Sequence, residues 1–177
     1  MTARGDTPLA ISHGTAIIVM GVSGVGKSTF AVQLARKLNI EFIEGDRLHS
    51  VSSVRKMAAG VALSDEDRWP WLDAVAVAVT AARSPNGVVA TCSALRRSYR
   101  DRLRGKLASP LLFICLTADH ATLSERLRLR EPHFMPEALL DSQLSALEMP
   151  GSDENAVVIS AAQPVQEMLR TLDTARE

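Results

Sequence analysis

The chain has 177 residues, of which 46% are hydrophobic and 23% are charged, a composition ordinary for a globular domain that can bury a core. Its 20 basic residues balance its 20 acidic residues, so net charge favours neither nucleic acid nor a membrane surface as a partner. No apolar run is long enough to span a membrane, and residues 1–15 lack the apolar stretch of a signal peptide. We therefore expect a cytoplasmic protein with a flexible tail over residues 1–15 and a single domain over residues 16–177.

The two cysteines fall within predicted strands. Cys92 and Cys115 are far apart in the sequence and form no C-x-x-C pair. This usage is typical of buried free thiols in a reducing compartment and argues against a disulfide or a metal site.

An apolar run over residues 16–20 predicts a buried strand, and it leads directly into a glycine-rich segment. Residues 21–28 match the pattern G-x-x-x-x-G-K-[ST], and a helical apolar pattern follows from Phe30. Glycines let successive backbone N–H groups wrap a phosphate, the lysine reaches the β and γ oxygens, and the Ser28 hydroxyl can ligate Mg²⁺. The segment therefore predicts a site for a nucleoside triphosphate with Mg²⁺. Its expected residues are Gly21, Val22, Ser23, Gly24, Val25, Gly26, Lys27, Ser28 and Thr29.

Strand and helix signals then alternate along the chain. The acidic start at residues 64–67 predicts a capped helix, in which Pro70 is tolerable only within the first turn. Val75, Val77 and Val79 alternate as in a strand, but the neighbouring alanines favour a helix, which we predict. The remaining predicted strands are 41–44, 87–92, 111–116 and 156–159. The remaining predicted helices are 53–59, 96–106, 119–130, 137–147 and one from Pro164.

Short apolar strands separated by helices predict a parallel sheet covered on both faces. We therefore expect an α/β fold of the P-loop NTPase class, a three-layer α/β/α sandwich with a five-stranded parallel sheet and a helical lid over about 126–140. Ligands bind at the carboxyl ends of the strands in such sheets. The glycine-rich loop, Asp46 and Ser93 all fall at that edge.

Asp46 follows the predicted strand 41–44. A carboxylate at a strand end can accept the proton of an attacking hydroxyl or help to order Mg²⁺. The alternative is that Asp46 caps the next helix through an Asx turn. Two other nucleotide-binding classes fit less well, because the chain has no N-K-x-D motif and its strand 111–116 ends in Thr117 rather than in aspartate.

Arg126 and Arg130 are four residues apart on a predicted helix, so both project from the same side. A proline-interrupted segment follows, as expected for a hinged lid. Arginines on a lid can stabilise the charge that develops on a transferring phosphoryl group. The alternative is a solvated basic face, which we assign to Arg128. The predicted catalytic residues are thus Lys27, Asp46, Arg126 and Arg130.

Further sequence blocks occur between about residues 17 and 164. They are Met20 with the loop, Gly45-Asp46 with His49, Lys56-Met57 with Gly60, Leu63, Asp65-Glu66-Asp67-Arg68, Pro70-Trp71-Leu72, Cys92-Ser93-Ala94-Leu95, Tyr99-Arg100-Asp101 and His133-Phe134-Met135. Together they resemble the gluconokinases, of the shikimate-kinase and nucleoside-monophosphate-kinase group. The Asp-Arg-x-Pro-Trp-Leu and Cys-Ser-Ala-Leu blocks discriminate this family from generic small-molecule kinases.

The resemblance implies transfer of the ATP γ-phosphoryl group to the 6-hydroxyl of D-gluconate, with Mg²⁺, by a protein that is commonly a homodimer. A polyhydroxy acid needs a cation for its carboxylate and polar groups for its hydroxyls. The expected acceptor-binding residues are Asp46, His49, Ser53, Arg55, Lys56, Arg68, Ser93 and His133. Which cation binds the carboxylate stays open, and His49 could equally be a loop residue whose ring is satisfied by backbone. Trp69 and Trp71 are interpreted as packing residues.

The chain departs from the family pattern in four places. Ser50 replaces a proline, Ser53 an asparagine, Pro132 a glycine and Leu144 a phenylalanine. The first two fall in the expected acceptor pocket, and Pro132 would stiffen the lid hinge. Two rival functions therefore stay open: a related kinase for shikimate, a nucleoside monophosphate or an antibiotic hydroxyl, and a non-catalytic switch that binds ATP and a partner protein.

Overall fold

The computed structural model describes residues 11, 13–108, 110–129 and 139–174. Five parallel strands form one sheet in the order β2-β3-β1-β4-β5. Their bounds are β1 Ala16–Met20, β2 Glu41–Ile43, β3 Val88–Thr91, β4 Leu111–Thr117 and β5 Ala156–Ser160. The predicted five-stranded parallel sheet is confirmed.

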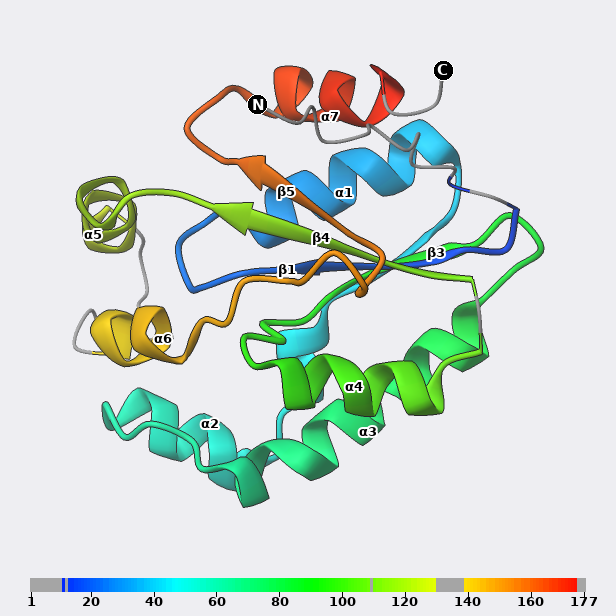
Figure 1. Ribbon diagram of the computed structural model, residues 1–177. Coiled ribbons are helices and arrows are strands. Elements are labelled where there is room, and N and C mark those ends of the chain that lie inside the picture. Colours follow the sequence, from blue (N-terminus) through cyan, green and yellow to red (C-terminus); the bar gives the residue numbers. More distant parts are fainter. Residues whose placement is uncertain (1–10, 12, 109, 130–138, 175–177) are drawn as a thin grey trace.

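Helices cover both faces of this sheet. The helical elements are α1 Lys27–Leu38, the 3₁₀ turn η1 Gly45–Leu48, α2 Val51–Ala58, α3 Asp65–Ala82, α4 Arg97–Lys106, α5 His120–Arg128, α6 Leu140–Ala146 and α7 Val165–Thr174. In Figure 1, α1 and α7 lie over one face, α3 and α4 lie over the other, and α5 and α6 lie beyond the carboxyl end of β4. This is the predicted three-layer sandwich. No helix in the described part of the chain is long and apolar enough to cross a lipid bilayer.

The central strand β1 supplies side chains to two hydrophobic cores, one on each face. Ile17 and Val19 pack with α1 and α7, while Ile18 and Met20 pack with α3 and α4. All of these side chains are fully buried, which explains why β1 reads as a continuous apolar run rather than an alternating one. Both cysteines are buried free thiols, as expected.

Helix α2 begins two residues before the predicted start at residue 53. Ser50 is its N-cap, since the Ser50 hydroxyl accepts a hydrogen bond from the backbone N–H of Ser53 at 3.1 Å. The expectation that Ser50 and Ser53 face the acceptor pocket is not met in this structure. The two hydroxyls lie 2.9 Å apart and line a separate shallow hollow with Trp71.

Helix α3 carries the predicted cap but not the predicted proline position. Ser64 accepts from the N–H of Asp67, and Asp67 accepts from the N–H of Ser64, which forms a capping box. Pro70 lies in the second turn rather than the first, where it removes the hydrogen bond to the carbonyl of residue 66. The next two residues, Trp71 and Leu72, are only 2% and 0% exposed. Their burial offsets the lost bond.

The ambiguous valine run resolves as helix. Val75 and Val79 are fully buried in the core below the sheet, whereas Val77 is 69% exposed. A spacing of four residues between buried positions is that of one helix face. The alternating pattern of these valines therefore reflects helical geometry and not a strand.

Candidate active site

The glycine-rich loop between β1 and α1 has the backbone conformation that phosphate binding requires. Gly21, Gly24 and Gly26 have φ of 135°, 79° and 100°, a region that side chains with a Cβ rarely adopt. At Gly21 a Cβ would also lie 2.6 Å from the carbonyl oxygen of Leu116. The loop therefore turns tightly against β4 and leads directly into the N-terminus of α1.

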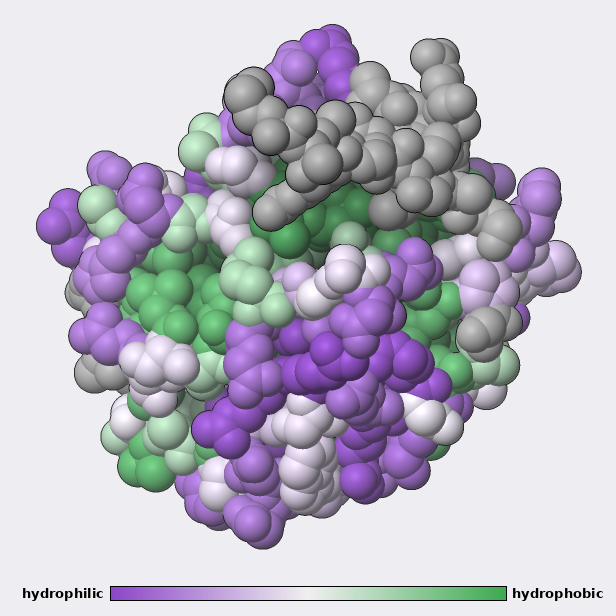
Figure 2. All heavy atoms as spheres, in the orientation of Figure 1, coloured by the Kyte–Doolittle hydropathy of each residue, from purple (hydrophilic) through white to green (hydrophobic). Residues whose placement is uncertain are grey.

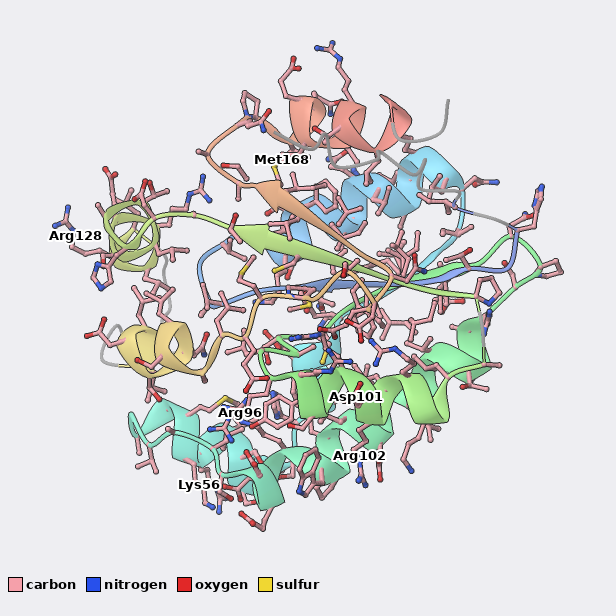
Figure 3. All side chains as sticks on the ribbon, in the orientation of Figure 1. Lys56, Arg96, Asp101, Arg102, Arg128 and Met168 are labelled. Atoms are coloured by element: carbon pink, nitrogen blue, oxygen red, sulfur yellow. The ribbon has the colours of Figure 1, made fainter. Side chains whose placement is uncertain are left out.

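A cavity of about 340 Å³, here called the loop cavity, opens beside this segment. Seven of the nine predicted loop residues line it, from Ser23 to Thr29. Gly21 and Val22 instead form the base of the loop, where Val22 is 2% exposed and its carbonyl accepts a 3.1 Å hydrogen bond from Lys27 Nζ. The other lining residues are Asp46, Arg126, Ala161, Gln163, Val165 and Met168, the last on α7 (Figure 3).

Arg126 reaches the loop cavity from α5. Its guanidinium donates to the carbonyl of Val25 at 3.3 Å and to the carbonyl of Ala161 at 2.8 Å. Arg126 thus bridges the glycine-rich loop and the segment after β5. Arg128 is exposed and projects outward from α5 (Figure 3), as a solvated residue does. The predicted residues Arg130, Pro132 and His133 lie outside the described residues.

A second cavity of about 310 Å³, here called the acceptor cavity, lies between the loop and α2, α3, α4 and α6. It brings together four of the predicted acceptor residues, Asp46, His49, Arg68 and Ser93. Its other lining residues are Ser23, Lys27, Met57, Ala62, Leu63, Leu95, Arg96, Tyr99, Leu139, Ser142, Gln143, Ser145 and Ala146. Ser23, Lys27 and Asp46 line both cavities, so they mark the place where the two meet.

Three predicted acceptor residues do not line this cavity. Ser53 is buried in the cap of α2, and Arg55 is exposed on that helix. Lys56 forms an ion pair with Asp67 at 2.7 Å and lies at the outer edge of the molecule in Figure 3. The helix directs Met57, rather than these polar side chains, toward the cavity.

Asp46 is held in place by its neighbours in η1. The N–H of Gly45 donates to the Thr91 hydroxyl at 3.0 Å, and Trp71 Nε1 donates to the Gly45 carbonyl at 2.8 Å. A Cβ on Gly45 would lie 1.9 Å from the Thr91 carbonyl oxygen, so only glycine allows this close approach. Within the described part of the chain the Asp46 carboxylate caps no helix, because the N-cap of η1 is Glu44 and that of the next helix, α2, is Ser50. The helix-capping alternative for Asp46 is therefore not observed.

Tyr99, Asp65 and Arg96, for which the sequence predicts no role, form a cluster beside Arg68. The Tyr99 hydroxyl donates to Asp65, and Arg96 donates to both oxygens of that carboxylate at 3.1 and 3.2 Å. The guanidinium carbons of Arg68 and Arg96 lie 5.7 and 5.9 Å from the centre of the Tyr99 ring. Burial and the bond to Asp65 raise the pKa of Tyr99 to about 12. The signal for Arg96 was its place directly after the Cys-Ser-Ala-Leu block.

Gln143 of α6 was also missed. Its Oε1 accepts a 2.7 Å hydrogen bond from the backbone N–H of Ser23, and its side chain lines the acceptor cavity. The contact connects the helix that follows residues 130–138 with the loop. No sequence signal distinguished Gln143, because an amide in a polar helix is ordinarily a surface residue.

Comparison with known proteins shows the family to which the chain belongs. A family model described as "AAA domain" matches residues 17–138. The chain is 47% identical over 148 residues to the gluconokinase of Gluconobacter oxydans (strain 621H). The aligned region covers 81% of each protein. It is 43% identical over 147 residues to the thermosensitive gluconokinase of Escherichia coli (strain K12), covering 82% of this chain and 78% of that protein.

Solved structures of kinases have the same fold as this chain. A gluconokinase from Sinorhizobium meliloti 1021 matches with a TM-score of 0.81 and 42% identity over 93% of each chain. A shikimate kinase from Bacteroides thetaiotaomicron matches with a TM-score of 0.65, over 90% of this chain and 97% of its own, but with 19% identity it shows a shared fold alone. From the loop geometry, the two meeting cavities and these relatives, we conclude that the chain belongs to the gluconokinase family of P-loop phosphotransferases.

Proposed function

We propose that this protein transfers the γ-phosphoryl group of ATP to the 6-hydroxyl of D-gluconate, giving 6-phosphogluconate and ADP. The observation that carries the proposal is the shared lining of the two cavities by Ser23, Lys27 and Asp46. A triphosphate in the loop cavity would end where an acceptor in the second cavity begins. Relatives that carry the name gluconokinase support the choice of acceptor.

On the donor side, the N–H groups of the loop and the ammonium of Lys27 would bind the phosphates. The residues present also fit Mg²⁺, which prefers oxygen ligands and keeps several waters and phosphate oxygens in such sites. Ser28 lines the loop cavity, and the described residues hold no cluster of three or more carboxylate, histidine or cysteine side chains that could enclose a metal. When bound, Mg²⁺ supplies positive charge that neutralises the phosphate oxygens.

On the acceptor side, Arg68 is the best candidate for binding the carboxylate of gluconate. Arg68 lines the acceptor cavity, and its Nε donates to the Leu63 carbonyl at 3.3 Å, while its terminal nitrogens have no hydrogen-bond or ion-pair partner among the described residues. Arg96 also lines the cavity but is already paired with Asp65. Lys56 is paired with Asp67 outside it. A guanidinium with free terminal N–H groups can bind a carboxylate through two parallel hydrogen bonds.

Asp46 would then act as the general base. It stands where the two cavities meet, and a carboxylate there can orient the acceptor hydroxyl and take its proton as the phosphoryl group is transferred in line. Arg126, anchored beside the loop, would add positive charge near the phosphates, and we propose the same for Arg130. The proton and charge chemistry thus rests on Lys27, Asp46 and these two arginines.

A coupled ADP-release assay tests the proposal. The purified protein is given ATP and Mg²⁺ with D-gluconate, shikimate, AMP or a hydroxyl-bearing antibiotic, and with no acceptor. We expect ADP release with gluconate alone, and a phosphorylated product whose phosphorus is on O6 by ³¹P NMR. Release with another acceptor would indicate the related-kinase alternative, and the absence of ADP release with every acceptor would favour a switch.

We also propose that the protein is cytoplasmic, as its composition and cysteine usage suggest, and a homodimer, as the family resemblance implies. Light scattering coupled to size-exclusion chromatography measures the mass in solution. A mass near that of the 19.1 kDa chain, rather than twice that value, would exclude the dimer.

A further inference from the structure

The side chain of His49 is held rigidly at the wall of the acceptor cavity. Its ring stacks on the Trp71 ring with the centroids 4.1 Å apart and the planes inclined by 14°. Trp71 is 2% exposed, and its Nε1 is bonded to the backbone carbonyl of Gly45, in the same segment as His49. The stacking therefore defines the plane of the imidazole ring.

The two ring nitrogens of His49 have different surroundings. Nδ1 is buried and has no hydrogen-bond partner among the described residues, whereas the residue as a whole lines the acceptor cavity. A ring satisfied by backbone, the alternative considered from the sequence, is thus not observed. Because Nδ1 is the enclosed nitrogen, Nε2 is the nitrogen that a molecule in the cavity can reach.

The enclosed nitrogen also indicates which tautomer is present. A neutral imidazole carries its proton on one nitrogen and a lone pair on the other. Burying an N–H without an acceptor is less tolerated than burying an acceptor lone pair without a donor. The proton therefore belongs on Nε2, which makes His49 a hydrogen-bond donor toward the cavity.

The ring is also uncharged near neutral pH. The pKa of His49 is lowered to about 4, mainly by burial; the nearby Asp46 carboxylate opposes this shift, and the positive charge of Arg68 adds to it. An uncharged imidazole does not compete with Arg68 for a carboxylate, and it does not neutralise Asp46. His49 is suited to bind a neutral polar group.

We propose that His49 is a specificity residue, whose Nε2–H donates to one hydroxyl oxygen of the acceptor other than the hydroxyl that Asp46 deprotonates. The inference rests on the proposed function and adds a division of labour to it. Arg68 binds the acid end of the acceptor, Asp46 contacts the reacting end, and His49 recognises a hydroxyl along the carbon chain. Acceptors lacking that hydroxyl would leave the site without a partner for His49.

Two substitutions separate this role from simple packing. His49→Gln places an amide NH₂ near the position of Nε2, whereas His49→Asn is too short to do so. We expect kcat/KM for gluconate to fall about tenfold in His49→Asn, the effect of losing about one hydrogen bond, and to recover substantially in His49→Gln. His120→Asn is the matched control, because His120 is 59% exposed on α5 and outside both cavities. Thermal unfolding shows whether each variant is folded.

Acceptor analogues then identify the partner. Gluconates that each lack the hydroxyl at C2, C3, C4 or C5 are assayed with the wild type and His49→Asn. We expect the tenfold difference to vanish for one analogue and to persist for the other three. A difference that persists for all four, or that is absent with gluconate itself, would overturn the proposal.

A spectroscopic readout keeps this inference separate from the proposed function. In protein labelled with ¹⁵N-histidine, the chemical shifts of the His49 ring nitrogens at pH 7 report the tautomer without any turnover. We expect the Nε2–H form. The Nδ1–H form or an imidazolium would refute the inference even if gluconate is phosphorylated, whereas failure to phosphorylate gluconate would refute the proposed acceptor.

Discussion

Arg100 and Glu154 form a buried ion pair behind the wall of the acceptor cavity. The Nε and one terminal nitrogen of Arg100 donate to the two carboxylate oxygens of Glu154 at 2.6 and 2.9 Å, and the side chains are 0% and 1% exposed. This bidentate bond to Arg100 is the main reason that the pKa of Glu154 is lowered to about 2.

The same guanidinium joins the segment after β3, which contains Ala94 and Leu95, to the segment after α6, which contains Glu148. The remaining nitrogen of Arg100 donates to the carbonyls of Ala94 and Leu95, both at 3.1 Å, and to that of Glu148 at 3.0 Å. Ala94 has φ of 43°, an unusual conformation for a residue with a Cβ, and these bonds help to hold it. Figure 2 shows the hydrophilic surface over α4, outside this buried pair.

Removing the charge of Glu154 should destabilise the protein strongly. We expect Glu154→Gln to lower the free energy of unfolding by about 3–5 kcal/mol, because it leaves the guanidinium of Arg100 buried without its counter-charge. Urea unfolding measures the difference. Asp153→Asn is the control, since Asp153 pairs with Arg97 at the surface with 61% of its side chain exposed, and we expect about 1 kcal/mol or less. Equal losses in the two variants would contradict this reasoning.

The effect of Glu154 should depend on pH in a defined window. Its folded pKa of about 2 lies below the ordinary value of 4.5, so the folded state favours the ionised form. The stabilisation is fully present above pH 4.5 and is lost as the pH falls through 2. The difference in unfolding free energy between wild type and Glu154→Gln should therefore shrink over this range. A difference that stays constant down to pH 2 would show that charge is not its origin.

Asp46→Asn should separate chemistry from nucleotide binding. We expect kcat with gluconate to fall by about 10²–10⁴-fold, the range ascribed to a general base, because an amide cannot accept the proton of the hydroxyl. ATP affinity, measured by calorimetry, should be nearly unchanged, because the loop residues remain. Unchanged turnover would remove Asp46 from the mechanism.

Arg68 and Lys56 form a matched pair of cations. Arg68→Met should raise the KM for gluconate about 10-fold to 100-fold, because a charge-assisted hydrogen bond contributes about 1.5–3 kcal/mol. Lys56→Met should leave this KM unchanged, because Lys56 pairs with Asp67 outside the cavity. Steady-state kinetics with saturating ATP compares the two, and a larger effect at Lys56 would reverse the assignment.

Two glycines test how the position of Asp46 is set. Gly45→Ala would place a Cβ 1.9 Å from the Thr91 carbonyl oxygen, so η1 must move away from β3. We expect both stability and kcat to fall. Gly105→Ala, in α4, has no neighbour within 4 Å of the added Cβ and should stabilise the protein by about 0.5–1 kcal/mol without changing kcat. Normal activity in Gly45→Ala would show that Asp46 tolerates displacement.

The donor half of the site was predictable because its residues are consecutive. The strand β1, the glycine-rich loop and the start of α1 follow one another in the chain, so the motif and the apolar patterns beside it place the loop at the N-terminus of α1. The capping box of α3 and the order of strands and helices were equally readable, because caps and periodicity are local signals. The position of Pro70 was not, since burial of Trp71 and Leu72 outweighed a local preference.

The acceptor half depended on tertiary structure. From the sequence alone, Lys56 and Arg68 are equally good candidates for binding the carboxylate of the acceptor. The sequence predicts no role for Arg96 or Gln143. The arrangement of α2, α3, α4 and α6 around the acceptor cavity decided which of these side chains line it. Sequence periodicity tells which residues share a face of a helix, but the orientation of that face is set by contacts with segments distant in the chain.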